Sequence, residues 1–147
     1  MVALRGIREM AMTRIGKVAL AAAAMVTAAG MSMAADDGVL GVWLDHTGRG
    51  AVEITECGDA VCGKVVWVAD AKNSEGCGLA ILGDVKPMGD GTYDEGWIYD
   101  PDRDAKFSVE LTPQGNKLSV HGYKGIKMLG ETFVWTRAPA DLQRCQS

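Results

Sequence analysis

Residues 106–120 read KFSVELTPQGNKLSV, and this stretch decides the fold. Apolar side chains alternate with polar ones on both sides of the turn residues PQGN at 113–116. The alternating apolar residues are Phe107, Val109, Leu111, Leu118 and Val120. This period of two is typical of antiparallel strands that have one buried face and one wet face. The stretch therefore predicts a β-hairpin with a single apolar side.

The same pattern extends over most of the chain. Seven strands are expected, at residues 39–45, 51–56, 62–68, 92–99, 106–111, 117–123 and 130–137. Residues 70–91 form a longer connection rich in Gly, Asp and Pro, in which the region 79–85 adds an eighth strand if it pairs. No window shows a sustained helical period. Short consecutive strands joined by hairpins predict an all-β fold, an up-and-down antiparallel barrel of seven to eight strands, with a sandwich as the alternative.

Residues 1–35 have the layout of a cleaved secretory signal peptide: a basic start, an apolar run at 18–31 and small residues at the end. The apolar run is shorter than the roughly 20 residues that cross a bilayer, which favours cleavage near Ala34 and Ala35 over a retained anchor. We therefore expect one exported domain, residues 36–147, in the periplasm or secreted and not embedded in a membrane.

The charge of the expected mature domain limits its partners. Four of the 15 basic residues and one of the 19 acidic residues lie in residues 1–35, so 11 basic and 18 acidic residues remain, a net charge of −7. No run of Lys and Arg is left. This composition argues against nucleic acid or anionic lipid as a partner, and we expect a monomer.

All four cysteines lie in the expected mature domain, and an even number in a small exported protein predicts two disulfides. Of the three possible pairings we favour Cys57 with Cys62, because a hairpin around residues 58–61 places them opposite each other. Cys77 then pairs with Cys145, which ties the C-terminal tail to the long connection. The alternative, a metal or redox site, lacks a C-x-x-C pair, and the two histidines show no ligand spacing.

Gly41-Val42-Trp43 on the first strand resembles the G-x-W element of lipocalins and their relatives. The resemblance implies that Trp43 closes one end of the barrel and that Arg137, on the last strand, stacks across it. A planar guanidinium on an indole face is favourable, and its donors reach backbone carbonyls. Phe133 and Trp135 share the face of Arg137 by their spacing of two.

A broader resemblance covers nearly the whole expected mature chain. The chain resembles the bacterial domain-of-unknown-function family 2147 (DUF2147), small exported proteins with a lipocalin-like barrel. The matching stretches are GVWL at 41–44, GRG at 48–50, CGD at 57–59, CGKVVW at 62–67, GLAILG at 78–83, GWIYDP at 96–101 and VHGYKGI at 120–126, with Gly130, Thr132, Trp135, Thr136 and Arg137. Cys77 and Cys145 are outside the common pattern of the family. The resemblance implies a fold and an exported location, and no established activity.

The four tryptophans fall one to a strand, which allows two interpretations. They line a cavity for a small apolar ligand, or they fill a solid core. Under the first interpretation the ligand-binding residues are Trp67, Trp97, Tyr99, Tyr123 and Trp135. The tyrosines would supply hydrogen bonds that orient the ligand, whereas Trp43 is structural.

Other patterns give weaker signals. Residues 100–104 have acids at alternate positions, as a calcium loop does, but Ala105 and Leu111 stand where that loop needs Gly and Glu. A solvated turn is the better interpretation. No nucleophile elbow, phosphate loop or Ser/His/Asp arrangement is present. We therefore expect no catalytic residue, no cofactor and no metal.

The segment 122–130 carries Ile126, Met128 and Leu129 between glycines. It is interpreted as a lid over the barrel mouth, a docking patch for a partner, or a plug of the barrel end.

The leading hypothesis is noncatalytic binding of a small, partly apolar molecule in or at the mouth of the barrel. The alternative is a solid barrel that docks a protein or an envelope polymer, and a cell-envelope enzyme comes third.

Overall fold

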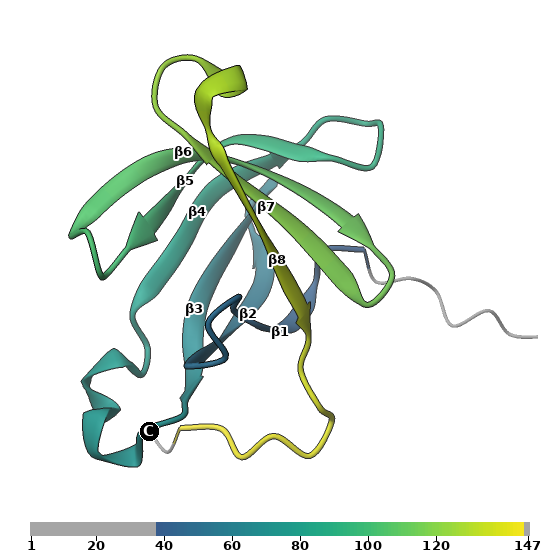
Figure 1. Cartoon of the computed structure of the whole chain (residues 1–147). Coiled ribbons are helices and arrows are strands. Elements are labelled where there is room, and N and C mark those ends of the chain that lie inside the picture. Colours follow the sequence, from purple (N-terminus) through teal and green to yellow (C-terminus); the bar gives the residue numbers. More distant parts are fainter. Residues whose placement is uncertain (1–37, 146–147) are drawn as a thin grey trace, which may run out of the picture. The chain divides into compact units, whose positions relative to one another are not determined.

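The computed structural model describes residues 38–145, which form an antiparallel barrel (Figure 1). The expected signal peptide and its cleavage site lie outside the described residues. Eight strands follow one another: β1 (Gly41–Leu44), β2 (Gly50–Cys57), β3 (Ala60–Val68), β4 (Ala80–Pro87), β5 (Tyr93–Asp100), β6 (Ala105–Gln114), β7 (Lys117–Tyr123) and β8 (Glu131–Arg137). Two short 3-10 helices, η1 (Ala71–Gly76) and η2 (Lys127–Leu129), lie in connections. Neither is long and apolar enough to cross a bilayer.

Each strand pairs with the next, and β1 pairs with β8, so the barrel is closed. The predicted up-and-down barrel is confirmed. β4 is the eighth strand, which the sequence predicts only if the region 79–85 pairs. The strands can meander in this way because short turns join most of them, as between Gln114 and Lys117. The closure is uneven: β7 and β8 share six residue pairs, whereas β1 and β8 share two.

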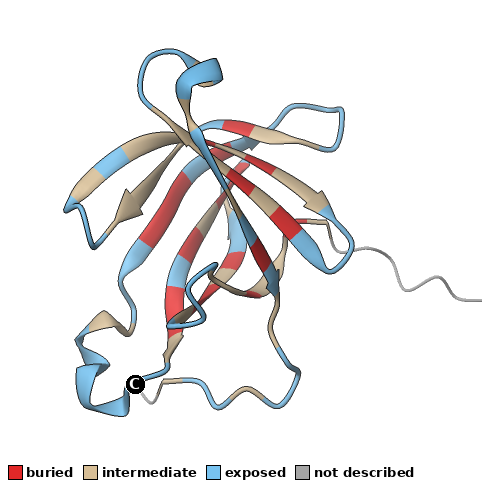
Figure 2. Cartoon of the chain, in the orientation of Figure 1, coloured by how far each residue is buried: buried red, intermediate tan, exposed pale blue. Residues whose placement is uncertain are grey.

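The hydrophobic core lies inside the barrel. Its fully or nearly fully buried members come from the segment before β1 and from every strand except β5: Val39, Trp43, Val52, Ile54, Val61, Val65, Ile81, Leu82, Val85, Val109, Leu111, Leu118, Val120 and Trp135. The predicted inward face of 106–120 is confirmed, because Val109, Leu111 and Val120 are at most 1% exposed. Figure 2 shows that the buried stretches lie on the strands and that the β7–β8 loop carries exposed residues.

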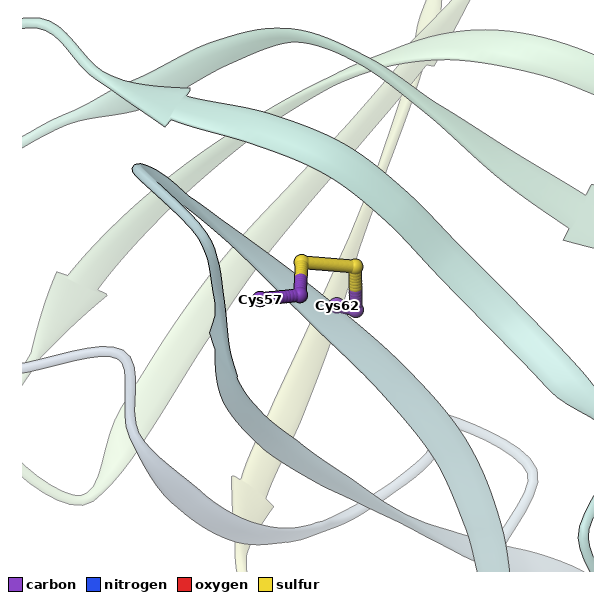
Figure 3. Close-up of a disulfide and its surroundings, with 2 residues drawn as sticks. All are labelled: Cys57 and Cys62. Carbon is purple, nitrogen blue, oxygen red and sulfur yellow. A yellow bond between two sulfur atoms is a disulfide. The ribbon is translucent and has the colours of Figure 1, made fainter.

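Both predicted disulfides form. Cys57–Cys62 joins β2 to β3 across their hairpin (Figure 3). Cys77–Cys145 joins the connection after η1 to the C-terminal tail. The tail is also held by the backbone amide of Cys145, which donates to the carbonyl of Val66 at 2.7 Å, and by Arg144, which forms two hydrogen bonds with Glu53 on β2. The second disulfide therefore reinforces a contact that backbone and side chains already make.

Candidate functional site

One end of the barrel is sealed by Trp43 and Arg137. Trp43 is fully buried, and its indole Nε1 donates to the carbonyl of Val39 at 2.9 Å. The guanidinium of Arg137 lies over the indole and donates to the carbonyls of Leu40 and of Gly38, the latter at 2.8 Å. Gly41 suits this position, because its φ of +119° strains other residues and a Cβ here would lie 2.6 Å from Arg137 Nη1. We call this the sealed end.

The opposite end carries apolar side chains that face inward but are only half-buried. Ile98 pairs with the core residue Leu82, and Phe133 pairs with the core residue Val120, so both point into the barrel. Phe107 pairs with Ile98 and shares its face. All three have intermediate exposure, in contrast to the buried residues one layer deeper. We call this the open end and define its apolar residues as Ile98, Phe107 and Phe133.

Charged and aromatic side chains surround the open end. Arg49 and Asp102 pair at 2.8 Å between the β1–β2 and β5–β6 turns, and Arg103 pairs with Glu131 on β8 at 3.0 Å. The ring of His46 stacks on Phe133 with the centroids 4.2 Å apart.

Two cations lie over the ring of Phe107: the guanidinium of Arg103 at 5.8 Å and the ammonium of Lys124 at 5.2 Å. Within residues 38–145 Lys124 has no carboxylate at ion-pair distance. The open end can therefore offer both an apolar surface and an uncompensated positive charge.

The structure does not bring the five predicted ligand-binding residues together. Trp135 belongs to the core and is 4% exposed. Trp67 pairs with Ala51, and Trp97 pairs with Gly83. Val68, next to Trp67, and Ile98, next to Trp97, pack against the core, so both indoles lie on the outer face of the barrel.

Trp97 has a structural position on this outer face. Its ring lies so close over Gly83 that a Cβ there would come within 2.3 Å of it. The ammonium of Lys106 also lies over this ring, 3.9 Å from its centroid. The indole is therefore already in contact with β4 and β6 of its own chain.

The two predicted tyrosines are likewise engaged. The hydroxyl of Tyr99 donates to Asp104 at 2.8 Å, and that of Tyr123 donates to Asp94 at 3.0 Å. The first bond lies within the acidic turn 100–104, where Asp100 Oδ1 accepts from the amide of Asp102 at 2.9 Å. Within residues 38–145 no three His, Cys, Asp or Glu side chains gather in a way that could hold a metal ion.

A polar network that the sequence did not reveal lies on the outer wall of β5, β6 and β7. Lys127 of η2 donates to Asp94 and, at 2.9 Å, to Glu110. Asp94 is 8% exposed, and burial raises its pKa, but hydrogen bonds from Lys127, the Glu95 amide and Tyr123 bring the pKa below its usual value. Hydrogen bonds to Asp94 and Glu110 raise the pKa of Lys127, so its ammonium stays protonated.

This network anchors the loop between β7 and β8. His121 reinforces it: Nε2 lies 2.7 Å from the carbonyl of Lys127 and must donate to it, and Nδ1 lies 2.7 Å from the hydroxyl of Thr132. A surface depression of about 610 Å³ lies beside the loop, lined by Glu110, Ser119, His121, Ile126, Lys127, Met128 and Thr132.

Exposed apolar side chains occur in the loop and on β8, and two of them, Ile126 and Met128, line the depression. Six large apolar side chains are exposed in the described part of the chain, and four of them belong to the loop and to β8: Ile126, Met128, Leu129 and Val134. We call these four the loop patch. Met128 is 88% exposed, so the loop does not plug the barrel, and the predicted plug is wrong in this respect.

Comparison with known proteins agrees with this geometry. Residues 41–137 match the model of a family described as uncharacterized proteins conserved in bacteria, DUF2147. The chain belongs to this family. The match begins at the glycine that precedes Trp43 and ends at Arg137, so it spans the barrel from the first strand to the last.

A solved structure described as protein HP1028 from Helicobacter pylori, a member of the lipocalin family, is similar with a TM-score of 0.56. The two sequences are 17% identical, and the alignment covers 69% of this chain and 84% of that one. At this identity the likeness supports the lipocalin-like barrel alone. No curated protein matches the chain.

Proposed function

We propose that this DUF2147 protein is an exported, noncatalytic binding protein that takes a small, partly apolar molecule at the open end of its barrel. The observation that carries the proposal is the position of Ile98, Phe107 and Phe133, which face inward and stay half-buried while the other end of the barrel is sealed. Small barrels bind ligands where the interior is not filled by their own side chains.

The surroundings of Phe107 indicate which molecules fit. Contact with the three apolar side chains favours a ligand with an apolar body. Lys124, which has no carboxylate partner in the described chain, favours a polar or negatively charged group at the rim. The anionic aromatic dye anilinonaphthalene sulfonate has both properties and serves as a probe.

The test is a fluorescence titration with this dye on the wild type and on two variants. Phe107→Ser removes an open-end ring and is expected to weaken binding about tenfold or more, because about 1.4 kcal/mol corresponds to a factor of ten. Met128→Ser, on the exposed loop, is the matched control and should bind as the wild type does. The proposal is contradicted if both variants bind the dye equally weakly, or if neither binds it more weakly than the wild type does.

A second candidate function is docking of a protein partner on the loop patch. It is supported by the exposure of Ile126, Met128, Leu129 and Val134, two of which line the depression, since exposed apolar patches mark interaction sites. In that case Met128→Asp should abolish capture of the partner while the melting temperature is unchanged, and Phe107→Ser should have no effect on capture.

A further inference from the structure

Strand β8 has a partner strand on only one side over most of its length. On one side it pairs with β7 from Glu131 to Thr136. On the other side β1 reaches only Thr136 and Arg137, because β1 ends at Leu44 and the chain then turns. Figure 1 shows β8 continuing past the end of β1. Residues 131–135 therefore form an open edge in a barrel that is otherwise closed.

Two hydrogen bonds fix which backbone groups face this edge. The amide of Arg137 donates to Asn116 on the β7 side, and the amide of Ala138 donates to Val42 on the β1 side, both at 2.9 Å. Backbone groups of successive strand residues point to opposite sides. Counting back, the N–H and C=O groups of Val134 and Thr132 point toward the β1 side. Within residues 38–145 no strand pairs with them there.

The side chains along the edge do nothing to block a further strand. Val134 is 50% exposed, and Thr132 is also exposed. Residues 132–135 read TFVW, without the Lys or Pro by which edge strands are usually protected from pairing. Glu131, at the start of the edge, is paired with Arg103. The exposed side chains of Met128 and Leu129 immediately precede the strand.

We propose that this edge pairs with the same edge of a second copy of the chain, antiparallel and about a two-fold axis at Phe133. Thr132 then lies opposite Val134 of the partner subunit, and each of the two such pairs exchanges two backbone hydrogen bonds. The unpaired backbone N–H and C=O groups belong to Thr132 and Val134, which lie symmetrically around Phe133. Each copy therefore presents the donors and acceptors with which the same groups of the other copy can pair.

The side chains also favour self-pairing. On the outer face the two-fold axis brings two β-branched side chains, Thr132 and Val134, together across the strands, a favourable cross-strand pair. The apolar loop patches of the two copies extend this contact. The paired edge is short, so we expect a weak dimer at the low end of interface sizes, which forms only at high concentration and leaves the monomer expected from the sequence at low concentration. The proposal does not depend on ligand binding at the open end.

The test combines sedimentation velocity with hydrogen exchange on the purified protein, from low micromolar to millimolar concentration. The sedimentation coefficient is expected to rise toward that of a dimer, and exchange of the Thr132 and Val134 amides is expected to slow over the same range. Val134→Lys places a charge at the edge and should keep the protein monomeric. Thr55→Lys, at an exposed position on β2, is the control and should dimerise as the wild type does.

A protein that stays monomeric at every concentration overturns the proposal. The edge would then be available to a strand of another protein. A dimer that Val134→Lys does not weaken, and in which the two amides exchange at an unchanged rate, also overturns it. If Val134→Lys fails to fold, as judged by circular dichroism, the exchange rates of the Thr132 and Val134 amides in the wild type test the proposal on their own.

Discussion

The guanidinium carbon of Arg137 lies 3.9 Å from the centroid of the Trp43 ring. One residue is on the last strand and the other on the first, and the two are paired in register. The contact therefore closes the barrel where its two terminal strands meet, over an interface of only two residue pairs. Few other backbone pairs support this seam, so its side chains carry much of the closure.

We expect Arg137→Lys to lower the free energy of unfolding by about 1–3 kcal/mol, because Lys cannot both stack on the indole and bond two carbonyls. Urea denaturation of the purified protein measures this. Arg144→Lys is the control: it weakens an exposed ion pair with Glu53 and should cost less than about 1 kcal/mol. Equal losses in the two variants would show that the seam does not depend on the stack.

The second prediction concerns the anchored loop. Lys127→Met removes the ammonium between Asp94 and Glu110 and leaves a carboxylate that is 8% exposed without its cation. We expect a loss of about 1–3 kcal/mol at neutral pH. Asp94→Asn in the same chain should recover part of this loss, because the double variant no longer buries an unpaired charge. Additive losses in a double-mutant cycle would contradict a direct coupling.

The third prediction is the pH dependence that Asp94 produces. Its pKa in the folded protein is below the usual 3.8, so the carboxylate stabilises the fold above that value, and this contribution is lost as the pH falls below it. Asp94→Asn should therefore be less stable than the wild type at neutral pH and lose less stability on acidification. Unfolding curves measured between neutral and strongly acidic pH test this. Parallel pH profiles for the wild type and Asp94→Asn would contradict this prediction.

The fourth prediction separates the two disulfides. Cys77 and Cys145 are 68 residues apart, and Cys57 and Cys62 are five apart. On the chain-entropy model, replacing the long-range pair by Ser should cost about 4 kcal/mol and the short-range pair about 2 kcal/mol. Thermal unfolding of the two double variants gives the comparison. A larger loss from the short-range pair would mean that local strain or packing, rather than the length of the loop that the disulfide closes, determines the loss of stability.

Much of the fold could be predicted because the strands alternate without interruption. The spacing of Phe107, Val109 and Leu111 gives the inward face of β6 directly, and the same count from Trp135 gives Phe133. That signal could have identified Phe107 and Phe133 as open-end residues. The aromatic character of the tryptophans favoured them as ligand-binding residues instead.

The position of Trp67 could not be counted in this way. The register of β2 and β3 shifts between Ala51 and Val52, so the alternation along β3 breaks just before Trp67. The outer-wall network was hidden for another reason. Asp94 and Lys127 are 33 residues apart, and only the closed barrel places a carboxylate of β5 beneath the loop after β7.

Binding of a small molecule at the open end is measured directly by amide chemical-shift mapping. The purified protein would be labelled with nitrogen-15 and titrated with anilinonaphthalene sulfonate. We expect the saturable shifts to centre on the amides of Ile98, Phe107 and Phe133. Saturable shifts centred on Met128 and Leu129, or no saturable shifts at all, would contradict binding at the open end.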